Sequence, residues 1–363
     1  MKAITKITKI IEIDENFIDE NLIKIAAAVI NNSGLVVFPT ETVYGLGANA
    51  LDPVAVGKIF AAKGRPSDNP LIVHVSNISM VEELIKHKEL LKNESYIKLM
   101  DAFWPGPLTI IFEKSEGVCR EATAGLDTVG IRMPGNKTAL SLIEAAGTGI
   151  AAPSANISGR PSPTLPEHVI ADMDGKADVI LNAGKCRVGV ESTVLDMTRK
   201  TPVILRPGGI SRAEIEKVLG RPVLMAGPDP QNIPKAPGMK YRHYAPNGKI
   251  FIFQGEKDIV TDTINKRVES ALASNIKPLV LASEQTFCYY KKECSIVWGN
   301  KDIPESFAQN LYAVLRYCDK AGAELIFVEA LTGSGIVEAV MNRLIKASGN
   351  NIINVPPERY MCT

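Results

Sequence analysis

Basic side chains in short loops are the first features of this sequence that could do chemistry. Lys63 and Arg65 stand two residues apart in the loop Lys63-Gly64-Arg65-Pro66-Ser67-Asp68-Asn69-Pro70, which glycine and proline shape. A lysine supplies a point charge and an arginine a planar fork, so the pair suits a phosphate chain. The alternative is a solvated charged turn, since charged residues are mostly exposed.

Small polar and basic residues recur wherever an apolar run ends. They occur in Pro39-Thr40-Glu41-Thr42, Pro153-Ser154-Ala155-Asn156, Gly159-Arg160-Pro161-Ser162, Glu191-Ser192 and Leu205-Arg206-Pro207-Gly208, while Thr128 and Arg132 flank a further run. Each could be a turn whose hydroxyls cap the local backbone. Taken together with their basic side chains, these loops favour a single cleft for an anionic ligand.

The sequence carries no recognisable pair of nucleophile and base. It lacks a GxSxG elbow, an HExxH motif and a cysteine beside a histidine motif. Such a cleft works by holding reactants and neutralising charge, which is typical of nucleotidyl or phosphoryl transfer. The four histidines show no metal-binding spacing, so we expect any metal to arrive with a phosphate.

Alternating helical and strand patterns must position these residues. The expected strands are 35–38, 71–75, 108–112, 129–133, 179–181, 193–197 and 203–205, and the expected helices are 17–30, 53–62, 79–89, 93–103, 136–146 and 165–173. This rhythm predicts an α/β fold, with a mixed sheet and helices on its faces. Ligand sites in open α/β sheets lie at strand ends, which is where the polar loops fall.

A proline-rich stretch divides the chain. Six prolines from Pro222 to Pro246 interrupt every periodic pattern. Beyond them, expected strands at 250–253, 279–282, 296–298 and 325–328 alternate with helices near 257–273, 305–320 and 336–346, which predicts a smaller parallel sheet. We expect a catalytic domain at 1–220, a linker at 221–248 and a second domain at 249–363. The loop at 332–335 could cradle an anion or simply cap a helix.

Length, composition and net charge favour some classes of protein over others. The chain has 363 residues, 45% of them hydrophobic and 22% charged, with a formal net charge of +1. This length favours two domains, and the balanced charge disfavours a dedicated nucleic-acid binder. The six cysteines form no CxxC pair, and no secretory leader or long apolar run is present. These features predict a reduced cytoplasmic protein without a membrane segment.

The motifs taken together resemble those of one family. PTETVYGLG, KGRPSDNPLIVHV, WPGPLT, TVGIRMP, APSAN, GRPSPT, ESTVLD, LRPG and APGMKYRHYAP are similar to motifs of the threonylcarbamoyl-AMP synthases, the YrdC-like domain proteins, in their long two-domain form. The resemblance spans nearly the whole chain. It implies a YrdC-like mixed twisted sheet followed by a Rossmann-like domain. It also implies an L-threonylcarbamoyladenylate synthase, which makes threonylcarbamoyl-AMP and pyrophosphate from L-threonine, bicarbonate and ATP.

The resemblance implies roles for residues at matching positions. Around threonine it places Thr42, His74, Arg132, the backbone of Ala152, and Ser192, with Arg132 forked onto the carboxylate. Around ATP it places Lys63, Arg65, Asn69, Thr128, Ser154, Asn156, Ser162 and Arg206, of which Lys63 and Arg65, nearest the triphosphate, are expected to be catalytic. From the linker, Tyr241, Arg242 or His243 would fold back over the cleft. Mg²⁺ would sit on the phosphates and not on protein side chains.

The resemblance also implies partners. The adenylate would pass to a separate transferase that modifies the tRNA adenosine beside the anticodon, without stable tRNA binding by this chain. The linker could shield the labile carbamate and adenylate from water, so that a chain ended after about residue 220 would fold but leak product or lose activity. Two other functions stay open: a double-stranded RNA-binding or ribosome-maturation factor, and a carbamoyl-transfer maturation enzyme.

Three further residues, His74, Trp104 and Glu41, need an interpretation of their own. His74 is either a half-buried strand histidine or a ligand, and the alternation that places it on one face with Ile72 favours a ligand. Trp104 is interpreted as a core residue. Glu41 is interpreted as a loop carboxylate and not as a base for the threonine ammonium, so that Glu41→Gln is expected to keep most activity.

Overall fold

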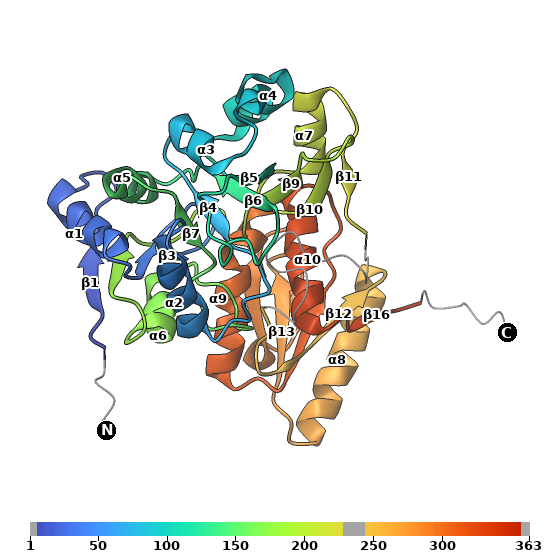
Figure 1. Cartoon of the computed structure of the whole chain (residues 1–363). Coiled ribbons are helices and arrows are strands. Elements are labelled where there is room, and N and C mark those ends of the chain that lie inside the picture. Colours follow the sequence, from blue (N-terminus) through green and yellow to red (C-terminus); the bar gives the residue numbers. More distant parts are fainter. Residues whose placement is uncertain (1–5, 228–243, 357–363) are drawn as a thin grey trace. The chain divides into compact units, whose positions relative to one another are not determined.

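The computed structural model describes residues 6–227 and 244–356. The chain divides into two compact units (Figure 1): unit 1 contains Met1–Ser158 and Ser162–Tyr241, and unit 2 contains Gly159–Pro161 and Arg242–Thr363. Three residues from within the sequence of unit 1 therefore belong to unit 2 by their contacts. The boundaries expected at residues 220 and 248 stay a prediction, and most of the expected linker lies outside the described residues.

Unit 1 is built on a mixed sheet, whose described strands run in the order β1-β8-β2-β3-β7-β4-β6-β5-β9-β10-β11. They are β1 (Lys9–Glu12), β2 (Val36–Phe38), β3 (Gly45–Asn49), β4 (Ile72–His74), β5 (Leu108–Glu113), β6 (Thr128–Arg132), β7 (Ile150–Ala152), β8 (Val179–Asn182), β9 (Thr193–Asp196), β10 (Val203–Arg206) and β11 (Leu224–Met225). At the centre, β4 is parallel to β6 and antiparallel to β7. Strands distant in sequence thus become neighbours.

Most helices of unit 1 begin at a residue whose side chain caps the first turn. The helices of this unit are α1 (Glu20–Asn31), α2 (Pro53–Lys63), α3 (Ile78–Leu84), α4 (Glu94–Phe103), α5 (Lys137–Ala146), α6 (Pro166–Met173) and α7 (Arg212–Leu219), with a 3₁₀ helix at Lys88–Lys92. Helix α2 begins after Asp52, whose carboxylate accepts from the backbone N–H groups of Val54 and Ala55. It ends because Gly64 adopts a left-handed conformation with φ +60°. Lys63 is therefore fixed in its last turn.

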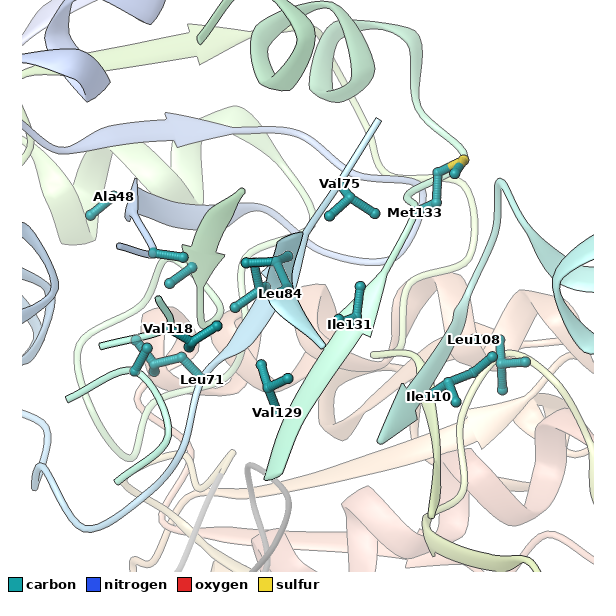
Figure 2. Close-up of a cluster of buried hydrophobic side chains, with 14 of the residues drawn as sticks. Ala48, Leu71, Val75, Leu84, Leu108, Ile110, Val118, Val129, Ile131 and Met133 are labelled. Atoms are coloured by element: carbon teal, nitrogen blue, oxygen red, sulfur yellow. The ribbon is translucent and has the colours of Figure 1, made fainter. Parts of the chain in front are cut away.

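The main core of unit 1 covers one face of the sheet. Val73, Val129 and Ile131 from the central strands pack there with residues of α2, α3, α4, α6 and α7, and Figure 2 shows part of this cluster. A second cluster joins α1 and α5 to β2 and β7. A third cluster is small and is formed by side chains from strands, among them Ile72 of β4 and Ile111 of β5. Ile72 alternates with Val73, so this third cluster lies on the face opposite the main core.

Unit 2 contains a parallel five-stranded sheet within the described residues, in the order β14-β13-β15-β12-β16. Its elements are β12 (Lys249–Gln254), α8 (Lys257–Ala273), β13 (Pro278–Ser283), β14 (Ser295–Gly299), α9 (Glu305–Ala321), β15 (Leu325–Glu329), α10 (Ile336–Ser348) and β16 (Ile352–Asn354), with 3₁₀ helices at Phe287–Tyr289 and Lys292–Cys294. Helix α8 packs on Phe253, Val280 and Phe327, while α9 and α10 pack on each other and on β14 and β12.

The expected α/β fold class is confirmed, with a large mixed sheet and a separate parallel one. Strands β1, β3, β7, β11 and β16 were not among the strands expected from the sequence. Strand β3 reads Gly-Leu-Gly-Ala-Asn and has little strand propensity, and it forms because β2 and β7 flank it. Trp104 is a core residue as predicted: it is 8% exposed and its Nε1 donates to Leu108 O at 2.7 Å.

Candidate functional site

The alternation of side chains along β6 places polar groups opposite the main core. Val129 and Ile131 belong to that core, so Thr128, Gly130 and Arg132 project from the other face. These three residues form a strip along β6. Thr128 and Arg132 lie at its two ends, about 13 Å apart at the usual rise of a strand. The strip is long enough for an extended ligand whose two ends are recognised separately.

Arg132 is held by three groups. Its Nη1 donates to Thr42 Oγ1 at 2.9 Å, and its Nε donates to Gly106 O at 3.2 Å. Its Nη2 lies 2.7 Å from Glu41 Oε1, and both side chains of this ion pair are 4% exposed. Glu41 is therefore more than the loop carboxylate that the sequence suggested. Breaking a buried ion pair leaves an uncompensated charge, so the pair is a strong restraint on the guanidinium.

The loop before β3 positions Thr42. Thr40 Oγ1 accepts from the backbone N–H groups of Thr42 and Val43 at 3.2 Å and donates to Val43 O at 2.6 Å. It also lies 2.8 Å from Thr42 Oγ1. This is the local capping expected of a turn. The same turn presents Thr42 to Arg132, so the capped turn is also part of the site.

His74 lies beside Arg132, since the two are Cα partners in the pairing of β4 with β6. Its Nδ1 is 3.4 Å from Ile150 O, and its ring meets the ring of Phe38 edge to face. Burial and then the charge of Arg132 lower the pKa of His74 to about 3. The imidazole is therefore neutral near pH 7, and a neutral ring donates at one nitrogen and accepts at the other.

Ser192 and Arg206 form a second buried group. Arg206 Nη2 donates to Ser192 O at 3.0 Å and to Ser192 Oγ at 3.2 Å. The hydroxyl of Thr109, on β5, lies 2.8 Å from Ser192 Oγ. The loop after β10 runs directly against this backbone, because a Cβ on Gly208 would lie 2.3 Å from Thr193 N. Two strand ends are thereby fixed to each other.

Lys63 joins the end of α2 to the loop that follows β7. Its Nζ donates to Ser154 O and to Asn156 O, both at 2.5 Å, and Ser154 Oγ donates to Asn156 Oδ1 at 2.5 Å. The lysine is 2% exposed. The structure thus brings together two of the motifs that the sequence associated with ATP, through hydrogen bonds from the lysine to backbone carbonyls.

Asn69 is buried, and its side-chain amide has no partner among the residues that the structure describes. The side chain is 1% exposed, and neither Oδ1 nor Nδ2 has a hydrogen bond within residues 6–227 and 244–356. Arg65 Nη2 donates to the backbone oxygens of Asn69 and Pro70 at 3.3 Å, which fixes the loop around it. Buried polar groups are almost always hydrogen-bonded, so this amide calls for a bound ligand or water.

The other expected site residues occupy different positions around the same unit. Ser162 Oγ donates to Glu191 Oε1 at 2.7 Å, and both side chains are buried. Ala152 ends β7, opposite Ile72 of β4. Thr128 is half-buried at the start of β6. Tyr241, Arg242 and His243 lie outside the described residues.

Sequence reasoning missed three side chains of this region as site residues: Glu41, Thr109 and Glu191. The available signal was weak. Glu41 and Glu191 each sit next to a hydroxyl residue beside an apolar run, and acidic residues are rarely buried unless they are paired. Thr109 is the second residue of the largely apolar strand β5, where a single threonine is ordinary.

The described residues, 6–227 and 244–356, contain no group of three or more His, Cys, Asp or Glu side chains arranged to hold a metal ion. In the same residues we find no helix with the length and hydropathy needed to span a membrane.

Two family profiles match the chain. The family described as "Telomere recombination" matches residues 28–208, and the one described as "Threonylcarbamoyl-AMP synthase, C-terminal domain" matches residues 210–349. The two matches together cover most of both units.

Two relatives that are similar over nearly the whole chain are both named threonylcarbamoyl-AMP synthase. The threonylcarbamoyl-AMP synthase of Pyrococcus abyssi is 46% identical over 96% of this chain and 100% of its own length, and that of Bacillus subtilis is 43% identical over 94% of this chain and 96% of its own. The crystal structure of P. abyssi Sua5 complexed with L-threonine superposes with a TM-score of 0.89, at 46% identity, over 96% of this chain and 100% of that one.

Proposed function

Because this chain belongs to the threonylcarbamoyl-AMP synthase family, we propose that its buried arginine and hydroxyl groups bind L-threonine and ATP along the face of the large sheet opposite its main core. The chain is an enzyme that makes threonylcarbamoyl-AMP and pyrophosphate from L-threonine, bicarbonate and ATP. The observation that carries the proposed site is the convergence of Arg132, Thr42 and His74, which come from three separate segments.

Threonine occupies the end of the strip at Arg132. The guanidinium forks onto the α-carboxylate, since Arg and carboxylate geometries match. Thr42 and His74 stand beside it, and the neutral imidazole offers one donor and one acceptor to the substrate. Ser192 and the backbone of Ala152 complete this end of the proposed site.

ATP occupies the loops around Lys63. Asn69 gains from the nucleotide the partner that its amide lacks, and Arg65 and Arg206 neutralise phosphate charge. Thr128, Ser154, Asn156 and Ser162 bind the remaining polar groups of the nucleotide. Mg²⁺ enters as part of the substrate, because it prefers phosphate oxygens and water to an all-protein cage.

Holding the two substrates in line accounts for the chemistry. The threonine nitrogen forms a bond to the carbon of bicarbonate and water leaves, which gives N-carboxythreonine. A carbamate oxygen then forms a bond to the α-phosphorus while the bond to pyrophosphate breaks. The transition state concentrates negative charge on the phosphoryl oxygens, which Lys63 and Arg65 stabilise. We place this enzyme in the cytoplasm, where ATP and tRNA are available, and its product goes to a separate transferase that modifies tRNA.

Pyrophosphate release from ATP, Mg²⁺ and bicarbonate, with and without threonine, tests this function. We expect threonine-dependent release that falls at least about a hundredfold in Lys63→Ala and Arg65→Ala, since each removes phosphate-binding charge. Lys58→Ala is the matched control, because Lys58 lies on the same helix and its exposed amine bonds only to Ser33 O.

Release that is indifferent to threonine would overturn the proposed substrate and favour carbamoyl transfer or RNA binding. If both variants still release pyrophosphate in a threonine-dependent way, the proposed function stands but the assignment of Lys63 and Arg65 to the ATP site is wrong.

A further inference from the structure

The buried ion pair beside the proposed threonine site has three polar atoms without a hydrogen bond in the part of the chain that the structure describes: both carboxylate oxygens of Glu41 and Nη2 of Arg132. Glu41 Oε1 lies 2.7 Å from Arg132 Nη2, but no N–H of Nη2 points along this contact, so the pair is electrostatic. Within the described residues, Glu41 Oε2 and Arg132 Nη2 have no hydrogen-bond partner. Both side chains are 4% exposed, so bulk water reaches neither.

A carboxylate oxygen buried without a donor is uncommon in folded proteins and costs free energy. A ligand that brings a donor to Oε2 and an acceptor to Nη2 relieves both deficits at once. An α-amino acid in its zwitterionic form carries that combination, with its ammonium and its carboxylate attached to one carbon.

We propose that Glu41 is a substrate-binding residue that accepts a hydrogen bond from the α-ammonium of threonine through Oε2, while Arg132 Nη2 binds the α-carboxylate. This deepens the proposed function and rests on threonine being the substrate. The Glu41–Arg132 pair then recognises both charges of the amino acid. The N–H that remains on N-carboxythreonine can keep the same bond to Oε2 after the carbon has been added.

The location of Glu41 supports a direct contact. Its neighbour Thr42 receives the hydrogen bond of Arg132 Nη1, so one short loop contacts both sides of the same guanidinium. The backbone of the loop is fixed by Val188 N, which donates to Glu41 O at 2.7 Å. The carbon of the Glu41 carboxyl lies 3.5 Å from where a Cβ on Gly135 would be, so glycine there leaves room beside the carboxylate.

A purely structural role for Glu41 makes a different prediction from direct binding. If Glu41 only orients Arg132, every ligand with the same carboxylate should lose affinity equally when Glu41 is changed. If Glu41 binds the ammonium, the loss should be confined to ligands that carry an amine. (R)-3-Hydroxybutanoate is threonine with its amine replaced by hydrogen, and it keeps the carboxylate and the hydroxyl.

The test measures the dissociation constants of threonine and of (R)-3-hydroxybutanoate for the full chain and for Glu41→Gln, by calorimetry or ligand-observed NMR. We expect threonine to bind about ten- to a hundredfold more weakly to the variant, the range for a hydrogen bond to a charged group, and the analogue to change less than about threefold. Arg132→Gln is the control, and it should weaken both ligands alike because they share the carboxylate.

Equal losses for both ligands in Glu41→Gln, or no loss for threonine, would overturn the proposal and leave the proposed function standing. If the variant does not fold, the two dissociation constants of the wild-type chain test the proposal. Threonine that binds less than about threefold more tightly than the analogue would overturn the ammonium contact. A wild-type chain that binds no threonine would remove the proposed function together with this inference.

Discussion

At the scale of single residues, the candidate site is a set of buried charged groups on strands β6 and β10 and at the end of helix α2. Arg132, Lys63 and Arg206 are each at most 4% exposed, and each bonds to backbone oxygens or to a hydroxyl. Charges buried in this way are held in fixed positions, which suits a reaction that depends on positioning. His74 differs from them because burial keeps it neutral.

His74 should make the protein sensitive to acid. Its folded pKa is lowered to about 3 from the ordinary 6.5, so below pH 6.5 the unfolded chain binds a proton that the folded chain does not. The stability that neutral His74 contributes is therefore full above pH 6.5 and is lost as the pH falls from 6.5 towards 3.

Urea unfolding of wild type and His74→Gln at pH 7 and pH 5 checks this. We expect the wild type to lose about 2 kcal/mol more than the variant over that interval, from about 1.4 kcal/mol for each pH unit below 6.5. Equal losses in the two proteins would show that His74 is protonated in the folded state.

At the scale of elements, close approaches of backbone fix the loops of the site. The loop after β10 lies against the start of β9, where only glycine fits at position 208. The last turn of α2 is joined to the loop after β7 through Lys63. Small shifts of these elements would separate the groups that must act together.

Gly208→Ala should therefore unfold or strongly destabilise unit 1. The new Cβ would lie 2.3 Å from Thr193 N and 2.4 Å from Glu191 O, which are backbone atoms that cannot turn aside. We expect a loss of at least about 3 kcal/mol in urea unfolding, at the upper end for overpacking.

Gly57→Ala is the matched control, since no atom lies within 4 Å of a Cβ there and the site is within helix α2. It should stabilise by about 0.5–1 kcal/mol. A Gly208→Ala protein as stable as wild type would mean that the loop after β10 can move without cost.

At the scale of the whole molecule, unit 2 includes three residues, Gly159–Pro161, from a loop that we assign to the proposed ATP site. Ala245 N donates to Gly159 O at 3.0 Å, and Arg316 Nη2 donates to Pro161 O at 2.6 Å. In sequence, Gly159–Pro161 lies between Asn156 and Ser162, two residues of the proposed ATP site. The folding of unit 2 should therefore affect ATP binding.

Arg316→Met should raise the KM for ATP by about fivefold and leave the KM for threonine unchanged, because it removes the hydrogen bond from Nη2 to Pro161 O, and such a bond is worth about 1 kcal/mol. Steady-state pyrophosphate release measures both constants. Arg267→Met is the control, since Arg267 also lies in unit 2 but packs over the ring of Phe253. Equal changes in both KM values would contradict a role confined to the ATP loop.

The sequence by itself determined most of the helices, many of the strands and the polar loops of this protein. Periodicity and caps such as Asp52 and Gly64 are local, so the bounds of α2 differ from its expected range by one residue. The motif loops at strand ends, the α/β class and the family resemblance could also be predicted, because they depend on residues that are close together in the sequence.

Only the tertiary structure decided which side chains meet. Glu41 pairs with Arg132, Thr109 with Ser192 and Lys63 with the carbonyl of Asn156, across separations of about 80 to 93 residues. These pairings depend on the strand order and register, in which β4 lies between β7 and β6 and β9 lies beside β5. Strand order is set by the burial of the whole sheet, which no local pattern records, and so the partner of the Glu41 carboxylate could not be found from its neighbours in sequence.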